Sequence, residues 1–293
     1  MTKHFVSLKD FTKDQILEFY DRISYFEENS FNTPAHYKYI VSMFFEPSTR
    51  TDLSFKLAGK KMGLEFLDFD SLKSSLQKGE TVLDTFLNLD AMGFNGYIVR
   101  TKEDGLLQML RPHLRSSLIN AGEGVTEHPS QGLLDGYSIW KEFRRMDDLH
   151  IAIVGDIPHS RVAHSNLDLL TKFNNKITLF SALHLQEENY PNMNIAADYE
   201  EFIRNVDVVI LLRNQHERHS EKLDLLSFHQ KFGLTEKRVS LLKKEAIIMH
   251  PGPIHHGVEI APSIIQNPQS RIYKQVQHSI PTRQAIFDYC LGV

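Results

Sequence analysis

Short apolar segments recur along the chain, and most of them lack the alternation of polar and apolar residues that marks a half-exposed strand. Continuous apolar runs are typical of strands in a parallel sheet whose two faces are both covered by helices. The segments predicted to be strands are 39–45, 96–99, 117–120, 151–154, 177–180, 206–212 and 246–249.

Helix-length stretches separate these strands, at 81–92, 131–144 and 161–172. The resulting order of strand, helix and strand predicts the α/β class. The tail at 281–291 is predicted to be a last helix, with Ile286, Phe287 and Leu291 on its apolar face.

The predicted strands form two groups, one that ends near residue 122 and one that opens at Ile151. A length of 293 residues also favours two domains over one. No linker rich in Pro, Gly or Ser separates the groups, so the helix at 133–144 is the expected connector. We therefore expect two doubly wound parallel-sheet domains joined by helices. The first comprises residues 1–136 with 279–293, and the second comprises residues 137–278.

Composition and charge narrow the classes of function. The chain has 33 Lys and Arg against 37 Asp and Glu, and the basic residues are dispersed, which argues against a nucleic-acid binder. The single cysteine, Cys290, excludes an internal disulfide. No apolar run is long enough to span a membrane, and no secretory leader is recognisable, so a cytoplasmic protein is expected.

Polar residues follow the predicted strands in a repeated way, at the edge where an open α/β sheet binds its ligands. The arginines and histidines that come after the apolar runs are Arg50, Arg100, His128, Arg161, Arg213 and His250. Arginine suits bidentate capture of carboxylate and phosphate, so this edge is predicted to bind small polyanions. Taken one at a time, each arginine could instead form a structural salt bridge, and His128 could be a packed loop residue.

The turn Ser48-Thr49-Arg50-Thr51 carries the sharpest signal. It places hydroxyls, backbone N–H groups and a guanidinium at a predicted helix N-terminus, which is a favourable phosphate site. An ordinary Ser/Thr helix cap is the alternative. Lys78 lies in a polar stretch that is expected to be a mobile loop, and a solvated loop without function is the alternative there.

Several familiar sites are missing from the sequence. Gly155 and Asp156 follow a strand without a G-x-G-x-x-G pattern, and neither a Walker A motif nor a nucleophile elbow occurs. The pairs His216/His219 and His255/His256 lack further ligands at a recognised spacing. We therefore expect neither a cofactor nor a metal.

Six segments together resemble the aspartate branch of the transcarbamoylase family. They are 44–51, 74–81, 128–131, 155–166, 213–218 and 250–260, and they run in order through nearly the whole chain. The resemblance implies the reaction of carbamoyl phosphate with L-aspartate to N-carbamoyl-L-aspartate and phosphate, early in pyrimidine biosynthesis. It also implies an active site in the cleft between the two domains and at a subunit interface.

The resemblance further implies a role for each matching residue. Ser48, Thr49, Arg50 and Thr51 would hold the phosphate, with Thr51, Arg100 and His128 at the carbonyl oxygen. Gln131, Gly252 and Pro253 would bind the carbamoyl amide. The residues implied to bind aspartate are Lys78, Arg161, Arg213 and Gln215. Glu46 would bridge to Arg161 and Arg218 when the domains close.

The family also implies that Lys78 and a neighbouring serine enter the site of an adjacent subunit, so that a homotrimer is expected. Ser75 is the preferred serine, but the sequence leaves the choice between Ser74 and Ser75 open. Regulatory or dihydroorotase chains are possible partners that the sequence does not reveal.

Two pairs of residues depart from the family pattern. Asp52 and Lys56 replace an arginine and an acidic residue or Gln, and their i,i+4 spacing predicts an ion pair of reversed sign. His255-His256 replaces the Asn-Arg of many relatives. Two alternatives remain, a transcarbamoylase for another amine such as ornithine, and a non-catalytic anion-binding relative. The segment His250-Pro251-Gly252-Pro253 argues against the ornithine branch, which typically has His-Cys-Leu-Pro there.

Overall fold

The computed structural model describes residues 2–29, 38–181, 183–214 and 225–293. It divides into two compact units. Unit 1 comprises Met1–Leu134 with His278–Val293, and unit 2 comprises Asp135–Gln277. The division points lie inside two helices, α5 (Pro129–Phe143) and α10 (Ile272–Leu291), so the predicted connection through helices is confirmed.

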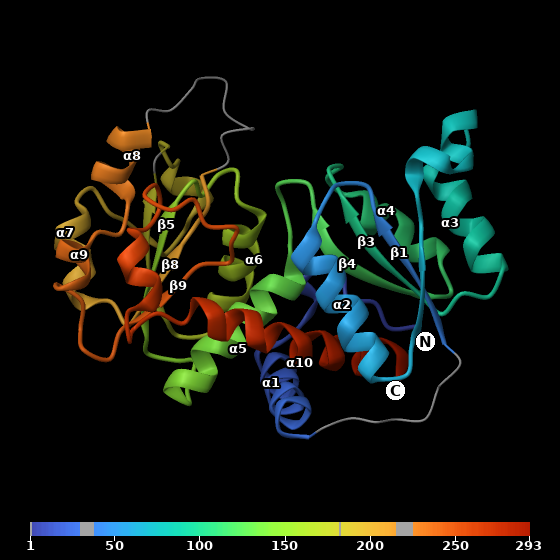
Figure 1. The fold of residues 1–293 in the computed structure, drawn as a ribbon, viewed down its shortest axis with the longest axis horizontal. Coiled ribbons are helices and arrows are strands. Elements are labelled where there is room, and N and C mark those ends of the chain that lie inside the picture. Colours follow the sequence, from blue (N-terminus) through green and yellow to red (C-terminus); the bar gives the residue numbers. More distant parts are fainter. Residues whose placement is uncertain (1, 30–37, 182, 215–224) are drawn as a thin grey trace. The chain divides into compact units, whose positions relative to one another are not determined.

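Unit 1 contains a parallel sheet in the order β2-β1-β3-β4. Its strands are β1 (Tyr39–Phe44), β2 (Glu65–Asp68), β3 (Gly96–Thr101) and β4 (Ser117–Glu123). The helices of this part are α1 (Lys13–Glu28), α2 (Thr49–Lys61), α3 (Val82–Ala91) and α4 (Leu106–Leu110). Figure 1 shows α2, α3 and α4 beside this sheet.

Unit 2 contains a second parallel sheet, in the order β7-β6-β5-β8-β9. Its strands are β5 (His150–Gly155), β6 (Lys176–Ser181), β7 (Asn194–Ile195), β8 (Val208–Leu211) and β9 (Ile247–Met249). The helices of this part are α6 (Arg161–Leu170), α7 (Tyr199–Phe202), α8 (Leu225–Phe232) and α9 (Glu236–Val239). The predicted fold class, α/β with two parallel sheets, is confirmed.

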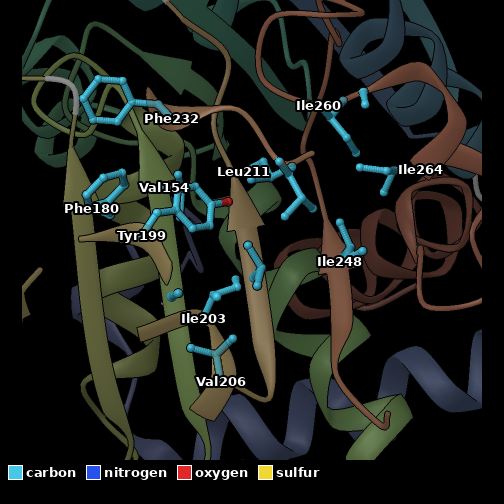
Figure 2. Close-up of a cluster of buried hydrophobic side chains, with 14 of the residues drawn as sticks. Val154, Phe180, Tyr199, Ile203, Val206, Leu211, Phe232, Ile248, Ile260 and Ile264 are labelled. Atoms are coloured by element: carbon cyan, nitrogen blue, oxygen red, sulfur yellow. The ribbon is translucent and has the colours of Figure 1, made fainter. Parts of the chain in front are cut away.

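The buried side chains explain why the central strands read as continuous apolar runs. In unit 2, Val154, Val209 and Leu211 belong to a cluster that also contains Phe180 and Tyr199, as Figure 2 shows for part of it. Every residue of β5 and of β8 is buried. Because both faces of these strands are covered, neither face needs polar residues, and the alternation disappears.

The prediction was wrong at the sheet edges and at the last helix. The edge strands β2 and β7 were missed because they are short and mostly exposed, so they carry no apolar run. The last helix was predicted to start at Pro281, but α10 starts at Ile272 and contains that proline. A proline often opens a helix, and here the packing of the preceding turns overrides that preference. No helix in the described part of the chain is long and apolar enough to cross a membrane.

One buried carboxylate shows how the strands position the helices of unit 1. Gly105 precedes α4 and has no side chain to cap it. Glu123, at the end of β4, accepts a hydrogen bond of 2.8 Å from the N–H of Leu107 instead. Burial, followed by the nearby Glu127 and Asp104, raises the pKa of Glu123 above its ordinary value.

Replacing Glu123 with glutamine should stabilise the protein at neutral pH. The pKa of Glu123 is higher in the folded than in the unfolded protein. Between these two pKa values the folded protein binds more protons, so its stability falls as the pH rises through this range. The Glu123→Gln variant keeps an acceptor for Leu107 without the charge. We expect its unfolding free energy in urea to exceed that of the wild type by about 1 kcal/mol at pH 7, with a gap that narrows toward pH 4.5.

Glu103→Gln provides the control. It removes an acidic charge from the same neighbourhood, but Glu103 is exposed, so no buried charge is removed. Its effect should stay within about 0.5 kcal/mol at both pH values. A wild type that is more stable than Glu123→Gln at pH 7 would contradict the prediction.

Candidate active site

The strand orders define one topological switch point in each sheet. In unit 1 the chain places β2 on one side of β1 and β3 on the other, so the switch lies between β1 and β3. In unit 2 the corresponding switch lies between β5 and β8. Ligands of open α/β sheets bind beyond the carboxyl ends of the strands at such points. The predicted arginines lie at the carboxyl end of these four strands or follow it, so each unit presents its own candidate half-site.

The first half-site begins at the N-terminus of α2. Ser48 is the N-cap residue, but its side chain makes no capping hydrogen bond. The serine or threonine caps of α1, α3 and α6 do accept such bonds, from Gln15, Asp84 and Ala163 respectively. The alternative of an ordinary cap at Ser48 is therefore wrong. The first N–H groups of a helix lack intrahelical partners, so they and the Ser48 hydroxyl are suited to bind an anion.

Arg100 joins this half-site from the neighbouring strand. It lies opposite Phe44 in the β1–β3 register, at the carboxyl end of β3. Its Nε lies 2.7 Å from Oε1 of Glu46, and both side chains are mostly buried. The two opposite charges form an ion pair, and one terminal nitrogen of Arg100 also donates to the carbonyl of Ala121 at 3.4 Å. Within unit 1, Glu46 is thus an ion-pair partner of Arg100. The expected bridge from Glu46 to Arg161 and Arg218 stays a prediction, and Arg218 lies outside the described residues.

The unusual Asp52 and Lys56 contact each other on α2. Nζ of Lys56 lies 2.9 Å from Oδ2 of Asp52, which confirms the predicted ion pair. The other oxygen of Asp52 accepts a hydrogen bond of 2.9 Å from the hydroxyl of Ser42 on β1. Nζ of Lys56 also lies 2.5 Å from Oδ1 of Asp68, so two carboxylates share one ammonium group, and the charge of Asp52 in the first turn of α2 is compensated only in part.

His128 and Gln131 lie at the start of α5. His128 is 5% exposed, and Pro129 is the first helical residue, a position where its missing N–H costs nothing. Nδ1 of His128 lies 3.4 Å from the hydroxyl of Ser130. A neutral imidazole has one ring nitrogen that donates and one that accepts, so the ring is chemically able to act as a hydrogen-bond donor. The side chain of Gln131 is half-buried one turn along.

The loop after β2 is folded into two short 3-10 turns, Ser71–Lys73 and Ser75–Lys78. The Ser74 hydroxyl is used inside the loop, because it accepts from the N–H of Leu76 and donates to the carbonyl of Ser71. Ser75 and Lys78 are exposed, and no hydrogen bond or ion pair of their side chains occurs among the described residues. Both side chains can therefore reach a partner outside the loop.

The second half-site begins at α6. Arg161 is the first helical residue and is 9% exposed. The hydroxyl of Ser160 accepts from the N–H of Ala163 at 3.2 Å, so this helix end is capped by its own serine. Gly155 ends β5 with a positive φ of 131°, and a Cβ there would lie 3.0 Å from the carbonyl oxygen of Leu212. Glycine therefore permits the close approach of β5 and β8 at the switch point.

Arg213 and Asn214 follow β8 after Leu212. The N–H of Asn214 donates to Oε1 of Glu259 at 2.9 Å, and the N–H of His255 donates to Oε2 of the same carboxylate at 2.9 Å. Nδ1 of His255 also lies 3.4 Å from Oε1. Burial raises the pKa of Glu259, and the two backbone donors act in the opposite direction. The segment with the unusual His255-His256 pair is thus tied to the segment that carries Arg213.

The turn after β9 is held by a buried polar network. The N–H of Gly252 donates to Nδ1 of His250 at 2.8 Å, and the N–H of His250 donates to Oε1 of Gln275 at 2.9 Å. Nε2 of Gln275 in turn donates to Asp135 at 2.9 Å. The backbone of Gly252 and Pro253 is therefore positioned by α5 and α10 within unit 2.

Some predicted residues lie outside the described part of the chain, namely Gln215, Arg218, His216 and His219. Among the described residues, no three His, Cys, Asp or Glu side chains gather in a way that could hold a metal ion. The described half-sites offer cations, backbone N–H groups and a histidine donor. This set can bind anions and stabilise a developing negative charge.

Comparison with known proteins identifies the family. A model described as the carbamoyl-P binding domain of aspartate/ornithine carbamoyltransferase matches residues 3–141, and a model of the Asp/Orn binding domain of the same family matches residues 147–290. The chain belongs to the aspartate/ornithine carbamoyltransferase family.

Relatives of this carbamoyltransferase match over their full length. The aspartate carbamoyltransferase catalytic subunit of Listeria innocua is 40% identical over 291 residues, which cover 99% of this chain and 96% of the relative. The catalytic subunit of M. jannaschii aspartate transcarbamoylase is 30% identical, with a TM-score of 0.87 over 99% of this chain and 98% of its own. The Trypanosoma cruzi enzyme in complex with carbamoyl phosphate and aspartate is 26% identical, with a TM-score of 0.88 over 99% and 97% of the two chains. The resemblance to the aspartate branch is confirmed.

Sequence reasoning missed the residues of this carbamoyltransferase that hold the site segments in place. Asp135, Gln275 and Glu259 are each no more than 2% exposed. Glu259 and Gln275 accept backbone N–H groups from residues 45 and 25 positions away, and Asp135 holds Gln275. Nearly every residue type has a backbone N–H, so a contact to a backbone N–H produces no motif that could be recognised in the sequence. Polar residues inside an apolar stretch, such as Glu259 between Val258 and Ile260, are the one available signal.

Proposed function

We propose that this carbamoyltransferase transfers the carbamoyl group of carbamoyl phosphate to the amino group of L-aspartate, giving N-carbamoyl-L-aspartate and phosphate. The observation that carries the proposal is the full-length match to aspartate carbamoyltransferase catalytic subunits. Both half-sites agree with it, because each presents arginine at a switch point. A dianionic phosphate and a dicarboxylate amine are the kind of ligands that such a pair of half-sites suits.

Unit 1 is the proposed carbamoyl phosphate site, with boundaries near residues 1–136 and 279–293. Ser48, Thr49, Arg50 and Thr51 hold the phosphate, and the uncapped Ser48 supports this role. Arg100 and His128, with Thr51, donate to the carbonyl oxygen as it becomes an oxyanion. Gln131, with the backbone of Gly252 and Pro253, binds the carbamoyl amide.

Unit 2, near residues 137–278, is the proposed aspartate site, in which Arg161, Arg213 and Gln215 bind the two carboxylates with Lys78. The amine attacks the carbamoyl carbon directly, because phosphate is already a good leaving group. Alignment of the reactants can supply about 7–11 kcal/mol, and each oxyanion donor about 2.7–4 kcal/mol. The departing phosphate can accept the proton of the amine, so no protein nucleophile is required. Closure, with Glu46 and Arg218 as bridging residues, excludes water.

We propose that the chain acts as a homotrimer in which Lys78 and Ser75 enter the site of an adjacent subunit. The commitment of the Ser74 hydroxyl inside its own loop favours Ser75 for this role. Large apolar side chains that are exposed in unit 1 support an interface there. They include Leu53, Leu57, Leu67, Leu72 and Met92. The assignments to pyrimidine biosynthesis and to the cytoplasm stay predictions, as does any association with regulatory or dihydroorotase chains.

An assay that offers aspartate and ornithine side by side tests the proposed reaction. With carbamoyl phosphate present, we expect carbamoyl aspartate and phosphate to appear in equal amounts, and no carbamoylated ornithine. Product on ornithine alone would favour the sibling branch. Binding of carbamoyl phosphate without either product would favour a non-catalytic relative.

A further inference from the structure

The carboxylate of Glu259 uses both of its oxygens to hold backbone. Glu259 is 2% exposed. Oε1 accepts from the N–H of Asn214 and Oε2 accepts from the N–H of His255, both at 2.9 Å. These two donors lie in different segments, one after β8 and one after β9. The side chain therefore joins two loops at the carboxyl edge of one sheet.

The main chain of Glu259 is itself fixed in the core of unit 2. Its carbonyl oxygen accepts from the N–H of Leu234 at 2.9 Å, and Leu234 accepts from the N–H of Ala261 at 2.9 Å. Its neighbours Val258 and Ile260 belong to the buried cluster, in which Figure 2 shows Ile260 together with Leu211 of β8. A carboxylate that projects from such a packed segment has little freedom to move.

The side chain of Asn214 gives the segment after β8 no comparable anchor. Asn214 is fully buried, yet neither its Oδ1 nor its Nδ2 has a hydrogen-bond partner in the described part of the chain. The last ladder bond of β8 runs from the N–H of Leu212 to the carbonyl of Val154. Beyond that point, the hydrogen bond from the N–H of Asn214 to Glu259 fixes the backbone next to Arg213.

We propose that Glu259 is a positioning residue for the aspartate site, which holds the backbone beside Arg213 at the angle needed to receive a substrate carboxylate. This inference rests on the proposed function. A glutamine cannot replace the glutamate, because it offers one acceptor oxygen and one NH₂ group, and the NH₂ group would face a backbone N–H. One of the two loops would then lose its attachment while the size of the side chain stays the same.

The test compares the steady-state kinetics of the wild type and Glu259→Gln. We expect kcat/KM for aspartate to fall about 10- to 100-fold, because small misplacements of a substrate-binding group have effects of this size. The KM for carbamoyl phosphate should change less than about threefold. Hydrogen–deuterium exchange of the unliganded protein should show faster exchange in peptides that contain Asn214 or His255. If Glu259→Gln does not fold, Glu259→Asp, which keeps both oxygens on a shorter stem, takes its place in the same measurements.

Asp207→Asn is the matched control. Asp207 accepts the N–H of His150 at 2.8 Å and pairs with Lys243 at 2.7 Å, but it lies before β8, at the opposite end of that strand. This variant should lower the melting temperature without changing the KM for aspartate. Equal kinetic effects in the two variants, or unchanged exchange at Asn214 and His255, would overturn the proposal. A wild type that forms no carbamoyl aspartate would overturn the proposed reaction instead, while the exchange measurement still reports on the positioning.

Discussion

Replacing Arg50 with alanine should lower kcat/KM for carbamoyl phosphate about a hundred- to a thousandfold, the usual effect of removing one donor to a developing negative charge. Arg50 lies in the first turn of α2. The N-cap residue of this helix, Ser48, makes no capping hydrogen bond with its side chain. Its guanidinium is proposed to add to the helix-end N–H groups at the phosphate, so the variant should also bind inorganic phosphate less tightly. Steady-state kinetics with varied carbamoyl phosphate, and product inhibition by phosphate, measure both effects.

Lys60→Ala provides the control on the same helix. Lys60 is exposed in the last turn of α2, so this variant removes an equal charge far from the N-terminus. It should change kcat/KM less than about twofold, because an exposed charge at that distance is screened. If the two variants lose activity equally, activity depends on the total positive charge of α2 and not on the position of Arg50 at its N-terminus.

Lys78→Ala chains and Arg50→Ala chains, each nearly inactive alone, should regain activity when they are dissociated, mixed and reassembled. If a site takes Arg50 from one subunit and Lys78 from its neighbour, random assembly of equal amounts gives about one quarter of the sites both native residues. The exposure of Lys78, with no ion pair of its own among the described residues, supports its use by another chain. The specific activity of the mixture, compared with that of each parent treated in the same way, measures the effect.

The double variant Arg50→Ala/Lys78→Ala, mixed with an excess of either single variant, separates complementation from simple refolding. Such a mixture with Arg50→Ala chains contains no native Arg50 and should stay inactive. Recovery there, or no recovery in the mixture of single variants, would show that the site is not shared between subunits. The proposed reaction would be unaffected by that outcome.

The sequence alone determined the strands that are buried on both faces and the residues that follow them. Segments such as 151–154 and 206–212 were recognised because continuous burial produces a continuous apolar run. The turn at Ser48 to Thr51 and the arginines after the strands were recognised for the same local reason, since they directly follow such runs in the chain. The ion pair of Asp52 and Lys56 also follows from spacing on a single helix.

The tertiary structure decided the order of the strands, and with it the switch points between β1 and β3 and between β5 and β8. Strand order depends on pairing between distant segments, which no local pattern records. For the same reason, the sequence did not reveal the ion pair of Arg100 with Glu46 or the hydrogen bond from the N–H of Asn214 to Glu259. A backbone N–H is the same for nearly every residue type, so only the folded chain shows which carboxylate it meets.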